Sequence, residues 1–219
     1  MSSLRVRYQT IEFGDNDIHV RTLRDRQQFS NSDSATAEKL GVSPASWPLF
    51  GVVWDSSQIL AQLMFEYDIV GKRILEVGCG IGLSSLMLNQ REANITATDY
   101  NPEAGKFLKK NVTLNDGALI PFVQTDWADD NSELGEFDLI IGSDLLYEPD
   151  HAELLSNFID RHAKADCKVI LVDPGRGNHP RFSKMMVALG YSHRQAKPTI
   201  VSEQSKTFRG QILSYQRHH

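Results

Sequence analysis

Three glycines at alternate positions follow a short apolar run in the segment RILEVGCGIGLSS. They are Gly78, Gly80 and Gly82, which we call the glycine corner, and the acid Glu76 stands just before them. Such corners let a backbone approach a ligand closely. A second acid, Asp99, ends the next apolar run about 20 residues later, where a carboxylate can accept hydrogen bonds from both ribose hydroxyls. The pattern indicates a site for a nucleoside-containing cofactor.

The acid beside the glycine corner bears on the charge of that cofactor. A pyrophosphate favours Lys or Arg, or a helix N-terminus clear of carboxylates. Here Glu76 adjoins the corner, and the spacing is G-x-G-x-G rather than the dinucleotide pattern G-x-G-x-x-G. The segment therefore favours a cofactor with a cationic centre. A tight turn without a ligand is the alternative.

The elements that must position these residues alternate along the chain. Apolar runs predict strands at residues 73–77, 94–99, 119–126, 137–144 and 168–173. Helical patterns occupy 55–68, 82–91, 101–116, 149–164 and 179–190. This alternation predicts a parallel sheet with right-handed crossovers. The last two strands, 191–196 and 206–216, have no helix between them and are expected to pair antiparallel at one edge.

Several helix starts carry capping signals. Asn101 followed by Pro102 is a start signal, and Asp55 or Ser56 is expected to cap the helix at 55–68. Asp150 with Glu153 three residues later has the form of a capping box at the start of the helix at 149–164.

The N-terminal region differs in character from the rest. Residues 6–23 alternate around GDND, which predicts a hairpin. The Ser-rich residues that follow form a connection or lid, with a short helix near Ala35–Leu40, or a plain surface linker. We therefore divide the chain into residues 1–46, the hairpin and connection, and residues 47–219, the main domain.

Composition excludes several classes of protein. The chain has 219 residues, 41% of them hydrophobic, which fits one ordinary domain. A formal net charge of -5 argues against a nucleic-acid partner. No segment has the form of a secretory signal or a bilayer-spanning run. Cys79 and Cys167 form no metal-ligand spacing and are interpreted as reduced thiols, so we predict no metal site and a soluble, cytoplasmic protein.

From about Trp47 onwards, the sequence resembles the seven-strand S-adenosylmethionine-dependent methyltransferases. ILEVGCGIG is similar to their first motif, ATDYNPEA to the second, VQTDW to the adenine-contacting segment, and FDLIIGSDLLY to the fourth strand. The resemblance implies an α/β fold with a Rossmann-like, mostly parallel seven-stranded sheet and an antiparallel C-terminal edge hairpin, beside the N-terminal β-hairpin extension. It also implies S-adenosyl-L-methionine as cofactor.

The same resemblance implies roles for individual residues. The glycine corner would approach the cofactor, with Glu76 near its amino-acid end and Asp99 on the ribose. Tyr100 would flank the adenine, Asp126 would accept from the adenine amino group, and Trp127 would pack on the ring. Trp127 as a plain core aromatic is the alternative.

Two features narrow the resemblance to the protein lysine methyltransferases of the seven-strand class. Trp54 precedes the helix that leads into the first strand, and SDLLY carries a D-x-x-Y element, Asp144 and Tyr147. In that group the Trp contributes to the cofactor pocket and the D-x-x-Y element borders the methyl acceptor. Ser143, just before the element, is also expected to contact the cofactor.

Acceptor chemistry accounts for this pair. A lysine amine has an ordinary pKa of about 10.4, so a site must favour its neutral form or remove a proton. Asp144 could orient the ammonium, while Tyr147 could fix the amine through its hydroxyl and attract a cation with its ring. The alternative is that Asp144 caps a turn and Tyr147 packs in the core. His151 could be a base or a helix-surface residue, and Arg176 could bind an acidic substrate or hold its loop.

A protein lysine methyltransferase is not the only function that these residues allow. A small-molecule N-methyltransferase on the same fold is the main alternative. A nucleic-acid base methyltransferase is disfavoured because SDLLY lacks the prolines of an N/D-P-P-Y/F element and the chain is acidic. A non-catalytic scaffold is disfavoured because Asp99, Asp144 and Tyr147 are all present.

Overall fold

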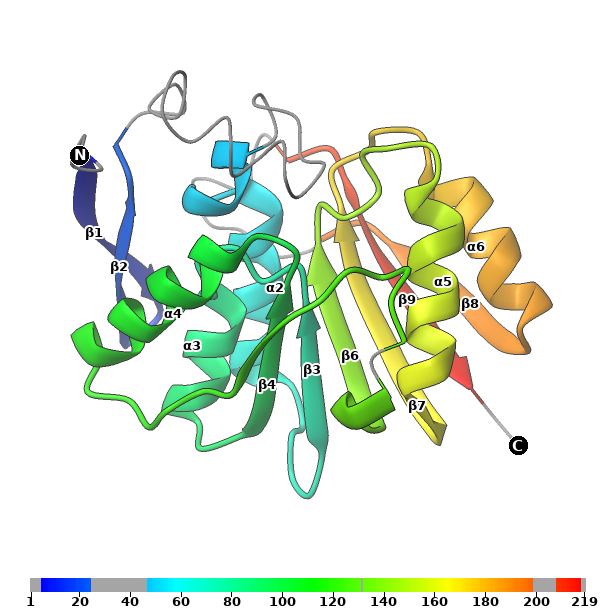
Figure 1. The fold of residues 1–219 in the computed structure, drawn as a ribbon, viewed down its shortest axis with the longest axis horizontal. Coiled ribbons are helices and arrows are strands. Elements are labelled where there is room, and N and C mark those ends of the chain that lie inside the picture. Colours follow the sequence, from blue (N-terminus) through cyan, green and yellow to red (C-terminus); the bar gives the residue numbers. More distant parts are fainter. Residues whose placement is uncertain (1–4, 25–46, 131, 199–207, 218–219) are drawn as a thin grey trace.

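A mixed sheet of seven strands forms the centre of the protein in a computed structural model that describes residues 5–24, 47–130, 132–198 and 208–217 (Figure 1). Its strands are β3 (Arg73–Val77), β4 (Asn94–Asp99), β5 (Phe122–Gln124), β6 (Phe137–Ser143), β7 (Ala163–Asp173), β8 (Tyr191–Ala196) and β9 (Gln211–Arg217). Their order across the sheet is β5-β4-β3-β6-β7-β9-β8.

The strand directions confirm the predicted sheet. The five strands from β5 to β7 run parallel to their neighbours. β9 inserts between β7 and β8 and is antiparallel to both, so the C-terminal hairpin forms one edge of the sheet. The carboxyl ends of β3, β4, β6 and β7 therefore meet at one side, where ligands bind in open α/β sheets.

Helices cover both faces of the sheet. They are η1 (Trp47–Gly51), α2 (Asp55–Glu66), α3 (Leu83–Gln90), α4 (Pro102–Leu114), η2 (Ser132–Leu134), α5 (His151–His162) and α6 (His179–Ala188). Ile74 of β3 belongs to the core that includes residues of α2, α3 and α4, whereas its neighbour Leu75 belongs to the core that includes residues of α5 and α6. Figure 1 shows where these helices lie around the sheet. Burial on both faces explains why these strands are continuously apolar.

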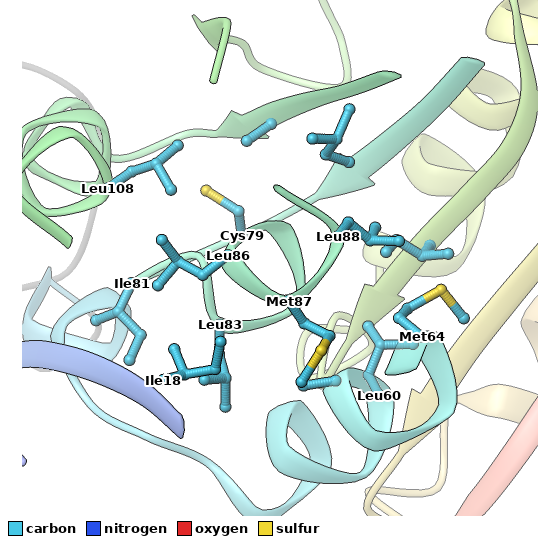
Figure 2. Packing of buried hydrophobic residues seen from close by; sticks show 14 of the residues in the cluster. Ile18, Leu60, Met64, Cys79, Ile81, Leu83, Leu86, Met87, Leu88 and Leu108 are labelled. Atoms are coloured by element: carbon cyan, nitrogen blue, oxygen red, sulfur yellow. The ribbon is translucent and has the colours of Figure 1, made fainter. Parts of the chain in front are cut away.

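α3 lies at the centre of the first of these two cores. Figure 2 shows Leu83 near Ile18 of the N-terminal hairpin, and Met87 beside Leu60 and Met64 of α2. Six of its eight residues are buried, from Leu83 to Leu88. The helix that follows the glycine corner is therefore packed on several sides, which fixes its first turn.

The predicted hairpin is present as β1 (Val6–Phe13) and β2 (Asn16–Leu23), and Asn111 of α4 and its C-cap residue Asn115 bind to β2. Asn111 accepts from the Arg21 N–H at 2.7 Å and donates to the Ile81 carbonyl at 3.0 Å. One turn later, Asn115 accepts from the His19 N–H at 2.8 Å and donates to its carbonyl at 2.7 Å. The side-chain amides thus replace a neighbouring strand.

Of the predicted caps, Asn101 is confirmed, Asp150 lies at the predicted N-cap position but without its capping box, and the cap predicted for the helix at 55–68 is wrong. Asn101 accepts from the Glu103 N–H at 2.9 Å, as expected. Asp150 has helical backbone angles, so its side chain cannot turn back to cap α5, and its carbonyl accepts from Glu153 and Leu154 instead. At α2 the N-cap is Trp54 rather than Asp55 or Ser56, with extended backbone angles and no side-chain cap.

The helix expected near Ala35–Leu40 lies outside the described residues, and the boundary at residue 46 stays a prediction. The two cysteines are free and buried. Among the described residues, no helix combines the length and apolarity that crossing a bilayer requires.

Asn111 and Asn115 give a matched test of hairpin docking. We expect Asn111→Ala to lower the free energy of unfolding by about 1–3 kcal/mol, because a fully buried amide leaves its Arg21 and Ile81 partners unpaired. Asn115→Ala should cost less, because water can replace the amide at exposed His19. Urea unfolding measures both, and equal losses would contradict this account.

Candidate functional site

The glycine corner joins β3 to α3 through three left-handed residues. Gly78, Gly80 and Gly82 have φ angles of 62°, 55° and 80°, a region that favours glycine. A Cβ on Gly78 would lie 2.5 Å from the Leu145 side chain, and one on Gly80 would lie 2.9 Å from the Phe50 carbonyl oxygen. The absent side chains thus make room for other segments of this chain, and close approach to a cofactor stays a prediction.

Glu76 is buried between β3 and the first turn of α3. Its Oε2 accepts from the Ser85 N–H at 2.9 Å and also from the Ser85 hydroxyl. Ser85 is the third residue of α3, whose N-cap is Gly82 and offers no side-chain oxygen. The carboxylate therefore serves as the cap and occupies the helix N-terminus that could otherwise attract an anion.

Asp99 holds the glycine corner from the neighbouring strand. Its Oδ2 accepts from the Gly80 N–H and its Oδ1 from the Asn101 N–H, each at 2.8 Å. The Cys79 N–H also donates to the Thr98 carbonyl at 2.9 Å. The end of β4 thus fixes the path of the corner and the start of α4.

Both acids have raised pKa values. Burial raises the pKa of Glu76 to about 7 and that of Asp99 to about 6, although the hydrogen bonds that they accept act in the opposite direction. The negative charge of Asp99 adds to the increase at Glu76. A cation near both carboxylates would relieve these costs, so the corner suits a positively charged group.

Tyr100, Asp126 and Trp127 gather at the ends of β4 and β5. Burial chiefly raises the pKa of Tyr100, and the charge of Asp126 raises it further, so the two lie within electrostatic range. Asp126 Oδ1 accepts from the Ala128 N–H at 2.9 Å. Trp127 is half-buried and packs at the border of the core beneath α5, which leaves both interpretations of this residue in place.

Asp144 follows β6 in a left-handed backbone conformation, with φ of 54°. Arg176 of the β7–α6 loop donates two hydrogen bonds to this carboxylate, from Nε to Oδ1 at 2.6 Å and from Nη2 to Oδ2 at 2.7 Å. This fork-to-fork pair is a strong, planar arrangement. Arg176 therefore contacts the adjacent loop, and Asp144 is paired with a cation rather than serving only as a turn cap.

Tyr147 lies on the same loop and is 42% exposed, so it is not a core residue. Burial raises its pKa to about 12, and the charges of Asp99, Glu148 and Asp144 add to the increase. The hydroxyl therefore stays protonated at neutral pH. Because the charge of Asp99 raises the pKa of Tyr147, Tyr147 lies within electrostatic range of the predicted ribose acid.

His151 connects the two halves of the site. Its ring meets Tyr147 edge-on at 4.5 Å and Trp127 edge-on at 5.1 Å between centroids. Its Nδ1 lies 2.7 Å from the Leu145 carbonyl, which can only accept, so Nδ1 carries the hydrogen. His151 is thus a half-buried contact between rings and not a freely exposed helix residue.

The last two candidates border this arrangement. The Trp54 indole donates to the Leu49 carbonyl at 3.0 Å, in the short helix η1 whose Phe50 carbonyl lies against Gly80. Ser143 is the final residue of β6 and directly precedes Asp144. The structure therefore gathers the sequence candidates at one edge of the sheet.

Comparison with known proteins accords with this geometry. A family model described as lysine methyltransferase matches residues 48–186. The chain belongs to the lysine methyltransferase family.

Individual relatives of this chain differ in the acceptor that their names specify. The electron transfer flavoprotein beta subunit lysine methyltransferase of Rattus norvegicus is 33% identical over 171 residues, covering 76% of this chain and 63% of the rat protein. A histidine protein methyltransferase 1 homolog of Dictyostelium discoideum is 31% identical over 126 residues, covering 54% and 41%. The chain thus spans less than two thirds of these two relatives.

Among solved structures, a 16S rRNA methyltransferase of T. thermophilus in complex with AdoMet and guanosine superposes with a TM-score of 0.67 at 16% identity. The match covers 99% of this chain and 51% of that one, and it shows the shared Rossmann-like fold.

Two residues of this site make contacts that the sequence does not reveal. The sequence allows two roles for Arg176, and its partner Asp144 lies 32 residues away. The sequence allows a base or a helix-surface residue at His151, but its ring packs between Tyr147 and Trp127. The only local signal was the glycines that flank Arg176 in DPGRG, which mark a loop.

The raised pKa of Glu76 gives a pH prediction. Between about pH 4.5 and 7 the folded protein binds more protons at Glu76 than the unfolded chain does, so stability falls as pH rises, by up to about 1.4 kcal/mol per pH unit. Asp99 contributes with the same sign at lower pH. In Glu76→Gln the decline should be shallower.

Urea unfolding of both proteins at pH 5, 6 and 7 measures the difference. The free-energy gap between wild type and Glu76→Gln should narrow towards pH 7. A gap independent of pH would show that Glu76 titrates alike in both states.

Proposed function

We propose that the chain is an S-adenosylmethionine-dependent methyltransferase that methylates a protein on a lysine side-chain amine. The family and the rat relative support the reaction and the acceptor. The observation that carries the cofactor is the Glu76 carboxylate on the N-terminus of α3, because it replaces an anion where a pyrophosphate would bind. The electron transfer flavoprotein beta subunit, which the rat relative's name specifies, is the first acceptor to test.

The residues fit this cofactor. The Asp99 carboxylate accepts from the backbone N–H groups of Gly80, Asn101 and Tyr100, and its two oxygens together offer about four acceptor positions, so one remains for a ribose hydroxyl. Tyr100 and Trp127 offer aromatic surfaces for an adenine, and Asp126 offers a carboxylate for its amino group. When bound, S-adenosylmethionine supplies an electrophilic methyl carbon on a sulfonium, and the C–S electron pair remains on sulfur.

This chain's own residues would prepare the acceptor. The lysine nitrogen needs a free lone pair, so its ammonium must lose a proton before transfer. Asp144 would orient the ammonium and draw off that proton. Tyr147, a phenol at neutral pH, would hold the amine through its oxygen and face the cation with its ring. The protein contributes mainly alignment.

The surroundings fit a basic protein surface better than a nucleic acid. Glu148 and Asp150 are exposed on the loop that carries Tyr147, and they would attract a lysine-bearing segment. The cytoplasm remains the expected compartment, since two free, buried thiols suit a reducing environment.

Cofactor binding tests the first half of the proposal. Wild type should bind S-adenosylhomocysteine in a calorimetric titration, and Asp99→Ala should bind it about 10- to 100-fold more weakly, because hydrogen bonds to a charged group are lost. Asp68→Ala is the matched control, since that exposed acid lies just before β3, at the amino end of the strand and so away from the site at the carboxyl ends. No binding by folded wild type would refute the function.

Methyl transfer tests the second half. With labelled S-adenosylmethionine and the flavoprotein β subunit or a cell lysate, wild type should label a protein, and mass spectrometry should place the methyl on lysine. Asp144→Asn and Tyr147→Phe should each lower kcat/KM at least about 10-fold without weakening the binding of S-adenosylhomocysteine, because both side chains act on the methyl acceptor. Label on histidine, or only in small molecules, would contradict the lysine assignment.

A further inference from the structure

The Asp144 carboxylate is already occupied by a cation of the same chain. Both of its oxygens bind the Arg176 guanidinium, and only 10% of its side chain is exposed, against 43% for Arg176. The guanidinium thus covers the acid on the solvent side. A lysine ammonium that is to meet Asp144 must first take the place of this group.

The surrounding charges make that place a cation site. A second carboxylate, Asp173 at the end of β7, is 3% exposed and lies within electrostatic range of both Asp144 and Arg176. Its Oδ2 has no hydrogen-bond partner among the described residues. When Arg176 withdraws, the carboxylates of Asp144 and Asp173 lose their cationic neighbour, and an incoming ammonium again compensates part of their negative charge.

The loop that carries Arg176 permits withdrawal. Gly175 and Gly177 flank it with φ angles of 96° and 93°, and among the described residues no atom beyond their chain neighbours lies within 4 Å of where their Cβ atoms would be. The loop is fastened at its ends instead, by the Gly175 N–H to Asp173 at 2.8 Å and by the Asn178 amide to the Leu146 carbonyl at 3.0 Å. The side chain can therefore leave while its base stays anchored.

We propose that Arg176 determines acceptor specificity: it is an internal cation that a protein-borne amine displaces from Asp144 and a free amine does not. The inference rests on the proposed function and deepens it. A tethered side chain competes at a roughly millimolar or higher effective concentration, which a dilute small amine cannot match. A lysine on a docked protein gains the same advantage from its own attachment.

The probe is n-butylamine, which reproduces a lysine side chain without a protein. Removing the charge in Arg176→Met should tighten n-butylammonium binding about 10-fold or more, in the protein alone and with S-adenosylhomocysteine, because Asp144 becomes available to form a charge-assisted pair. Methylation of n-butylamine should rise through a lower KM rather than a higher kcat. Arg176→Lys should stay near wild type, since a cation remains.

Two further variants separate charge from structure. Arg181→Met removes an arginine of α6 that donates to the Pro149 carbonyl at 3.0 Å and so holds the β6–α5 loop, which also carries Asp144. If Arg176 only held this loop in place, Arg181→Met would have the same effect. We expect no gain in this variant. Asp144→Asn combined with Arg176→Met should abolish the gain, because the exposed acid is then missing.

The outcomes distinguish a failure of the role proposed for Arg176 from a failure of the proposed function. Unchanged n-butylammonium affinity in folded Arg176→Met, or an equal gain in Arg181→Met, overturns the role of Arg176. That result leaves the proposed function standing if wild type binds S-adenosylhomocysteine and methylates a protein lysine. Wild type that binds no cofactor refutes the methyltransferase, while the cofactor-free titration still shows whether Arg176 masks Asp144.

Discussion

The structure of the site depends on how the chain passes from β3 into α3. Three left-handed glycines make that passage, and backbone hydrogen bonds hold part of it: the Cys79 N–H donates to the Thr98 carbonyl and the Gly82 N–H to the Cys79 carbonyl. Two carboxylates complete the hold: Glu76 accepts from the first turn of α3, and Asp99 accepts from the Gly80 N–H. The corner therefore depends on β3 and β4 being neighbours, with an acid at the end of β4 and one residue before the end of β3.

This hold has an electrical consequence. A helix N-terminus at the carboxyl end of a strand usually attracts phosphate, but here a carboxylate fills it. Burial makes both acids reluctant to ionise, and a cation is the group that eases this cost. The same side chains that shape the corner thus select the charge of what binds there, which connects stability to cofactor choice.

Local patterns in the sequence were sufficient for the fold, and the position of the site stays a prediction. Apolar runs, the glycine corner and the Asn101 cap depend on near neighbours, and the structure has them as expected. Asp150 lies at the N-cap position of α5 but makes no side-chain cap, because its backbone angles are already helical. The pairing of Asn111 with Arg21 and of Arg176 with Asp144 joins residues 90 and 32 apart, which no local pattern reveals.

Long-range pairing also explains why two acids at one sheet edge behave differently. Glu76 is satisfied by neutral donors of Ser85, so its charge remains available to a cation. Both Asp144 oxygens accept from a guanidinium, so the negative charge of Asp144 is already neutralised until that group moves. The difference follows from sheet order: β3 faces the start of its own helix, whereas β6 lies beside β7, whose loop brings Arg176. Strand adjacency thus pairs Glu76 with the neutral donors of Ser85 and Asp144 with the guanidinium of Arg176.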